Sequence, residues 1–149
     1  MPRWAATGFD FQSSGEFAII TANMEANFIE KGRIVEKPWG HEIIWAHTER
    51  YVGKVLHINK GESLSYQYHV VKDETIRLLT GVLEMDVELA GERQKLRLAP
   101  GECLHIVPGM KHRMTAVEDC DVLEVSTPEL DDVVRLEDRY GRAGSGSAK

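Results

Sequence analysis

The pattern of hydrophobic and polar residues along the chain favours β-strands. In the clearest run, Leu83–Leu89, every second residue is apolar and the residues between them are acidic. Apolar residues with a period of two lie on one face of a strand, so this run predicts a half-buried strand. Ala90, Gly91 and Glu92 supply a tight turn, and Leu96 and Leu98 alternate with basic residues after it. The two runs therefore predict a β-hairpin.

Similar short runs recur at intervals of roughly 8 to 12 residues, a spacing typical of a β-sandwich or barrel. Most of the gaps between them contain Gly or Pro. The further predicted strands are residues 41–46, 51–58, 64–69, 75–80, 102–107, 112–116 and 121–126. Residues 130–138 are predicted as a short helix, because Asp131 and Asp132 near its start suit the positive end of a helix. An extended tail lying on the barrel is the alternative for this segment.

The length of 149 residues predicts one domain. Residues 1–23 show no sustained period and are interpreted as an N-terminal arm, while residues 24–142 are interpreted as the domain itself. Met24 directly precedes the first orderly segment, which is compatible with an internal start. Residues 143–149 have the Gly, Ser and Ala composition of a flexible tail.

Composition and charge limit the kinds of partner that the protein can bind. The formal charge of −6 and the pI near 5.5 argue against a nucleic-acid footprint, which needs clustered Lys and Arg. No run approaches the roughly 20 apolar residues of a membrane helix, and no signal sequence is recognisable, so we expect a cytoplasmic protein without a membrane partner. Cys103 and Cys120 have no metal-like spacing and are interpreted as reduced interior thiols. Small molecules or other proteins are the expected partners.

Two glycine-bounded stretches carry metal-capable side chains. In the first, Gln67 and His69 are two residues apart on a predicted strand, so both side chains point to the same face. Glu74 follows after a short turn and can return to the same depth on the neighbouring strand. The second stretch ends in a Pro-Gly-x-x-His segment whose histidine is His112. Together the four side chains predict one metal site inside a barrel.

Two imidazoles, an amide oxygen and a carboxylate form a mixed nitrogen and oxygen ligand set. This set suits one divalent ion, zinc first, with iron, manganese, cobalt or nickel as alternatives. Taken singly, His69 or His112 would be interpreted as a packed core residue, and only their joint spacing favours ligation. The other histidines have no ligand-type residues at a matching spacing and are interpreted as structural or surface residues.

These residues resemble the cupin superfamily, whose motifs run G-x5-H-x-H-x3,4-E-x6-G and G-x5-P-x-G-x2-H-x3-N. The chain is most similar to the cupin domain of type II mannose-6-phosphate isomerases and to the C-terminal domain of mannose-1-phosphate guanylyltransferases. The matching pieces are residues 37–40, 61–81, 101–112 and 131–142. The resemblance implies an all-β double-stranded β-helix, or jelly-roll barrel, and it implies that Gln67 is a ligand, because this family commonly has Gln at the first position.

The resemblance also implies a metal-dependent aldose–ketose isomerisation of a sugar phosphate, in which a proton moves between C1 and C2. Lys72, Arg77 and Arg135 are the candidates for binding the substrate phosphate. Relatives typically read Gln-x-His-His-His-Arg-x-Glu-His-Trp, whereas this chain has Val70, Val71 and Thr75 at three imidazole positions. A non-catalytic sugar- or metabolite-binding cupin and a metal-dependent dioxygenase therefore stay open as alternatives. A homodimer is expected, because two-fold dimers are the commonest oligomers.

Overall fold

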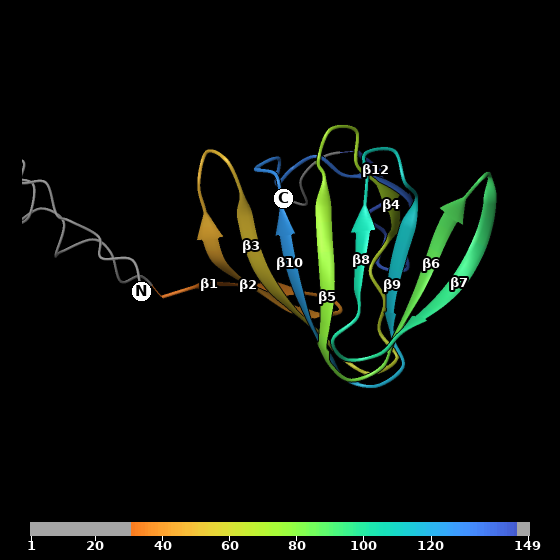
Figure 1. Ribbon diagram of the computed structural model, residues 1–149, viewed down its shortest axis with the longest axis horizontal. Coiled ribbons are helices and arrows are strands. Elements are labelled where there is room, and N and C mark those ends of the chain that lie inside the picture. The colour runs from red at the N-terminus through yellow and green to blue at the C-terminus, as the bar shows by residue number, and fades with distance from the viewer. Residues whose placement is uncertain (1–30, 146–149) are drawn as a thin grey trace, which may run out of the picture. The chain divides into compact units, whose positions relative to one another are not determined.

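Every regular element among residues 31–145, the part of the chain that the structure describes, is a β-strand. In this computed structural model the strands belong to one unit, Gly32–Lys149 (Figure 1). Their bounds are β1 Arg33–Lys37, β2 Gly40–His47, β3 Val52–Ile58, β4 Tyr66–Tyr68, β5 Glu74–Thr80, β6 Leu83–Leu89, β7 Glu92–Leu98, β8 Cys103–Ile106, β9 His112–Ala116, β10 Cys120–Ser126, β11 Val134–Glu137 and β12 Gly144–Ser145. The predicted arm at residues 1–23 and the last four residues of the predicted tail lie outside the described residues.

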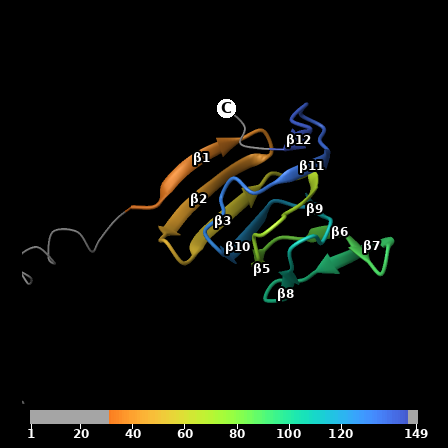
Figure 2. The same cartoon turned by 90° about the horizontal axis from the view of Figure 1, so that it is seen from above.

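The strands form two six-stranded antiparallel sheets. One sheet has the order β1-β2-β3-β10-β5-β8, and the other has the order β12-β11-β4-β9-β6-β7. Seen from above, the two sheets lie opposite each other (Figure 2). Strands that are distant in the sequence are neighbours in both sheets; β10, for example, lies between β3 and β5. The predicted all-β class is therefore confirmed.

The core lies between the sheets and follows the period of two. On β6 the residues Leu83, Met85 and Val87 are fully buried, as the alternating pattern predicts. Ile76 and Leu78 face them from the other sheet and belong to the same apolar cluster. The predicted bounds of β6 and β9 are correct, and the other predicted strands differ from the observed ones by one or two residues at their ends.

The C-terminal segment is extended, so the predicted helix at residues 130–138 is wrong and its alternative is confirmed. Strand β11 pairs with β4, placing Arg135 opposite Gln67. Of the two acidic residues that suggested a helix start, Asp132 instead accepts hydrogen bonds through its carboxylate from the backbone of a neighbouring turn. No helix that could span a membrane is found among the described residues. The interior prediction holds for Cys120 but is wrong for Cys103, which is exposed.

Candidate metal centre

Three of the predicted ligands come together at one end of the two sheets. His69 follows β4 directly, whereas Glu74 begins β5 and His112 begins β9. The Glu74 Oε1 atom lies 3.4 Å from His69 Nε2 and 3.5 Å from His112 Nε2. The three ligand atoms all lie within 4.8 Å of one another, and all three side chains are buried. These residues could therefore hold a metal ion.

The hydrogen bonds of the two imidazoles favour metal binding. His69 Nδ1 is bonded to the carbonyl oxygen of Asp132, and His112 Nδ1 is bonded to that of Met110 at 2.9 Å. A carbonyl oxygen only accepts, so each Nδ1 carries a hydrogen, and the neutral form of each ring has its lone pair at Nε2. Burial lowers the pKa of His112, which keeps this ring neutral. Both Nε2 atoms are buried without a hydrogen-bond partner, as expected of nitrogens that bind a metal.

Gln67 is positioned by its strand pairing. Its Cα is the partner of the His112 Cα in the β4–β9 pair, and its side chain lines the same cavity as His69. Ser65 Oγ donates a hydrogen bond to Gln67 Oε1. An amide oxygen has two lone pairs, so one of them is left for a further partner. Gln67 as fourth ligand stays a prediction.

Glu74 carries a negative charge in this site. Burial by itself favours the neutral acid, but the cationic neighbourhood, above all the Lys72 ammonium beside Oε2, prevails and holds the pKa of Glu74 well below its usual range. Lys72 Nζ contacts Glu74 Oε2 and lies 2.7 Å from Glu124 Oε1. The Glu124 and Glu74 charges outweigh the burial of Lys72, so the pKa of Lys72 is raised. The carboxylate is thus ionised and ready to bind a cation.

The turn between β4 and β5 is fixed from two sides. The Asp132 carboxylate accepts the backbone N–H groups of Val70, Val71 and Lys72 at 2.9, 2.6 and 2.7 Å. On the other side, the backbone N–H of Gly109 donates to the His69 carbonyl at 2.7 Å. The C-terminal segment and the β8–β9 loop therefore hold the His69 backbone in place.

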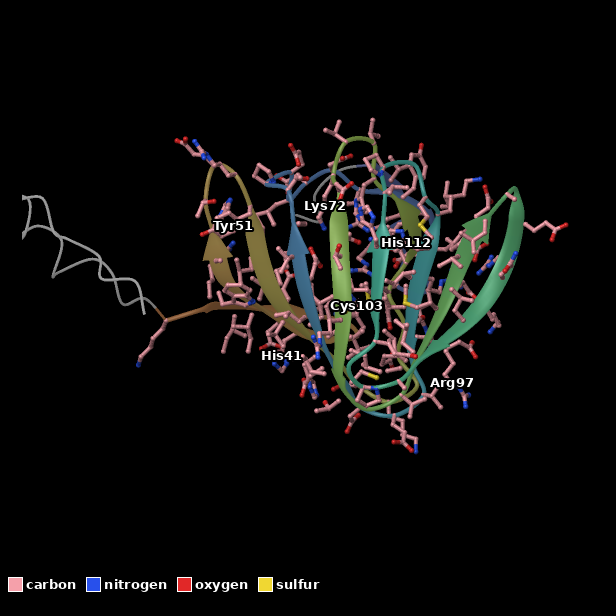
Figure 3. The ribbon with its side chains drawn as sticks, in the orientation of Figure 1. His41, Tyr51, Lys72, Arg97, Cys103 and His112 are labelled. Atoms are coloured by element: carbon pink, nitrogen blue, oxygen red, sulfur yellow. The ribbon has the colours of Figure 1, made fainter. Side chains whose placement is uncertain are left out.

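A cavity of about 650 Å³ opens beside His69, Glu74 and Gln67. Lys72 and Arg135, two of the predicted phosphate-binding residues, line it, and so does Arg142. Arg77 is not among its lining residues; its side chain is exposed, on the face of β5 opposite to Glu74. In Figure 3, Lys72 and His112 lie toward one end of the sheets and His41 and Arg97 toward the other. The structure thus brings Lys72 and Arg135 to the cavity and leaves Arg77 outside.

Sequence reasoning missed three buried charged residues of this cavity, Glu42, Lys54 and Glu124. Lys54 is the Cα partner of Glu124 across the β3–β10 pair, and its Nζ lies 3.8 Å from Glu124 Oε1 and 3.5 Å from Glu42 Oε2. A signal for them exists in the strand pattern. Lys54 alternates in phase with Val52 and Leu56, so its side chain points inward, where charges are rare unless paired.

Comparison with known proteins identifies the family. Residues 24–138 match the model of the C-terminal domain of mannose-6-phosphate isomerases. The chain belongs to this family. It is also 36% identical over 116 residues to the mannose-1-phosphate guanylyltransferase ManC of Salmonella typhimurium, and 34% identical over 116 residues to that of Escherichia coli. Both alignments cover 74% of this chain and 23% of the relative, so the chain spans about a quarter of the length of these proteins.

Solved structures identify the fold. KdgF from Halomonas sp. superposes with a TM-score of 0.57 at 24% identity, covering 66% of this chain and 88% of that one. Oxalate decarboxylase from Bacillus subtilis has a TM-score of 0.63 at 13% identity, over 70% of this chain and 30% of that one. CapF from Staphylococcus aureus has a TM-score of 0.61 at 17% identity, over 76% and 35%. The predicted cupin jelly roll is confirmed.

Proposed function

We propose that this protein is a metal-dependent cupin that interconverts an aldose phosphate and a ketose phosphate. One observation carries the proposal. Two buried imidazole Nε2 atoms lack a hydrogen-bond partner, and both face the same oxygen of an ionised Glu74. Buried polar atoms are rarely left unpaired, and a cation between these three atoms would satisfy all of them. Membership of the mannose-6-phosphate isomerase family supports a sugar phosphate as substrate.

In this proposal His69, Glu74, His112 and Gln67 hold one divalent ion, zinc in the first place. A bound divalent ion supplies Lewis acidity, which polarises a substrate oxygen. The residues of the chain do the remaining work. Lys72 stays protonated at neutral pH because its pKa is raised, so it acts as a cation and not as a general base. The Nδ1 hydrogen bonds of both histidines keep their rings oriented.

Arg135 is the proposed anchor for the substrate phosphate, because it lies on the wall of the same cavity as Gln67 and His69. Arg142 lines this cavity as well, and its charge, after burial, contributes to a lowered pKa of Arg135. The Arg142 guanidinium is already bonded to the Asp138 carboxylate, so the proposal assigns the phosphate to Arg135, whose guanidinium can bind it through two parallel hydrogen bonds. The cavity of about 650 Å³ is within the usual size range of small-molecule sites.

A direct assay tests this function. The metal content of the purified protein is measured first, and the loaded protein is then incubated with mannose 6-phosphate and with fructose 6-phosphate. We expect about one metal ion per chain and interconversion of the two sugars, both lost in His69→Ala. His47→Ala is the matched control, because His47 is an exposed histidine at the end of β2 and should change neither result. Absence of interconversion above the His69→Ala level would refute the isomerase proposal.

A second candidate function is a non-catalytic cupin that binds a sugar or nucleotide sugar. It is favoured by Val70 and Val71, which stand where relatives typically carry imidazoles and are each 61% exposed on the turn between β4 and β5. Thermal shift with a panel of sugar phosphates and nucleotide sugars separates the two functions. Binding without turnover supports the binding protein, and turnover excludes it.

A further inference from the structure

The two oxygens of the Glu74 carboxylate have different neighbours. Oε1 faces both histidine Nε2 atoms, at 3.4 and 3.5 Å, whereas Oε2 contacts the ammonium of Lys72. Both side chains are almost completely buried, with Lys72 5% and Glu74 2% exposed. A buried ammonium is stable only where carboxylates surround it, so this contact is not a loose surface pair.

Lys72 is itself held in place by further charges. Its Nζ atom lies 2.7 Å from Glu124 Oε1, and Glu124 is followed by Lys54 at 3.8 Å. Lys54 Nζ is in turn 3.5 Å from Glu42 Oε2. The last residue of the row is Lys37, whose Nζ lies 3.1 Å from Glu42 Oε1. Positive and negative groups alternate along this row. We call it the charge ladder; its members are Lys72, Glu124, Lys54, Glu42 and Lys37. A rotation of Lys72 away from Glu74 would leave a buried carboxylate without its counter-charge, and this is costly.

We propose that Lys72, anchored by Glu124, is a positioning residue that restricts Glu74 to binding the metal through Oε1 alone. The inference rests on the metal site proposed above. A carboxylate can bind a cation through one oxygen or through both, and the ammonium on Oε2 excludes the second mode. Groups that contact metal ligands from outside commonly fix the orientation of those ligands in this way.

One-oxygen binding by Glu74 has a chemical consequence. If Glu74 used both oxygens, its second oxygen would occupy a coordination position of the metal. With Oε2 held by Lys72, that position would be left for another ligand, and the cavity lined by Gln67 and His69 lies beside Glu74. An open position is what a substrate oxygen or a water molecule needs. Lys72 would thus preserve the reactivity of the centre through its contact with Glu74.

The test compares the coordination of cobalt-loaded Lys72→Met with that of wild type. The visible spectrum and X-ray absorption of Co²⁺ report the number of light atoms bound to the metal. We expect Lys72→Met to gain one oxygen in this shell, and Lys72→Arg, which keeps a donor for Oε2, to restore the wild-type spectrum. Lys37→Met is the matched control. It removes the same charge from the far end of the charge ladder, does not touch Glu74, and should leave the spectrum unchanged.

Glu124→Gln keeps the size of the side chain and removes the charge that anchors Lys72, so it provides a second variant if Lys72→Met fails to fold. It should move the spectrum in the same direction by a smaller amount. An unchanged cobalt shell in the folded variants overturns the positioning role and leaves the proposed function standing. Failure of wild type to bind cobalt or zinc overturns both, so the two failures are distinguishable.

Discussion

The Asp132 carboxylate connects the C-terminal segment to the turn that follows His69, and its removal should destabilise the protein measurably. It accepts three backbone N–H groups, those of Val70, Val71 and Lys72, at 2.9, 2.6 and 2.7 Å. In Asp132→Ala all three donors lose their acceptor. A hydrogen bond to a charged group contributes roughly 1.5 to 3 kcal/mol, but water can replace the acceptor at the exposed Val70 and Val71. We therefore expect a loss of about 2 to 3 kcal/mol in the free energy of unfolding.

The same contact predicts a pH dependence. Burial alone would raise the pKa of Asp132, but the three backbone hydrogen bonds prevail and lower it below the ordinary value of 3.8. A group whose pKa is lower in the folded state stabilises that state fully above the unfolded pKa. This stabilisation is lost as the pH falls through the folded-state pKa. The difference between wild type and Asp132→Ala should therefore be constant near neutral pH and shrink below about pH 4.

Urea unfolding of wild type, Asp132→Ala and Asp132→Asn at a series of pH values measures both effects. Asp132→Asn keeps one acceptor oxygen but no charge, and it should lose roughly half as much as Asp132→Ala. The matched control is Asp131→Ala, which removes the neighbouring exposed carboxylate and should change stability by less than about 0.5 kcal/mol. A loss in Asp132→Ala no larger than that of the control would refute the reasoning.

Three further predictions concern packing, backbone and metal. Ile76→Ala, at a fully buried position, should lower the free energy of unfolding in urea by about 2 to 5 kcal/mol. Thr75→Ala, on the exposed face of the same strand, should lower it by less than about 0.5 kcal/mol. Gly81 has a φ of +88°, and a Cβ there would lie 2.1 Å from the Asp119 carbonyl oxygen. Gly91 has a similar φ of +82°, but nothing lies within 4 Å of a Cβ at that position. Gly81→Ala should therefore lower the free energy of unfolding more than Gly91→Ala. The latter should cost roughly 1 to 2 kcal/mol, measured by thermal unfolding. Free zinc at about 100 times its Kd should raise the free energy of unfolding by about 2.7 kcal/mol, and this gain should vanish in His112→Ala.

The period of two explains why much of the fold and part of the site could be predicted. On β6 the alternation of Leu83, Met85 and Val87 with acidic residues favours one orientation of the strand, because shifting the register by one residue would turn all three acidic side chains toward the apolar core. The same rule placed Gln67 and His69 on one face, and both line the cavity. The sequence therefore predicted the inward orientation of these apolar side chains and of Gln67 and His69.

The remaining features depend on which strands become neighbours, and no local pattern contains that information. Glu124 forms an ion pair with Lys72, which lies 52 residues away in the sequence. It is close to Lys54 only because β10 pairs with β3. The C-terminal segment was misjudged for a related reason. An acidic pair before an apolar run suits a helix start, but the donors that Asp132 meets belong to the distant turn after β4. Tertiary contact thus overrides the local preference.

The contacts around the centre also bear on how the site works. His69 is oriented by the Asp132 carbonyl, Glu74 by Lys72, and His112 by the Met110 carbonyl, and none of these three contacts requires a metal. Ligands that are already oriented would lose little freedom on binding a cation, so little binding energy would be spent on ordering the protein. Two of these three partners are backbone carbonyls, which substitution of a side chain does not remove. Lys72 is the exception among these three, so a change of its side chain would alter the centre without removing a ligand.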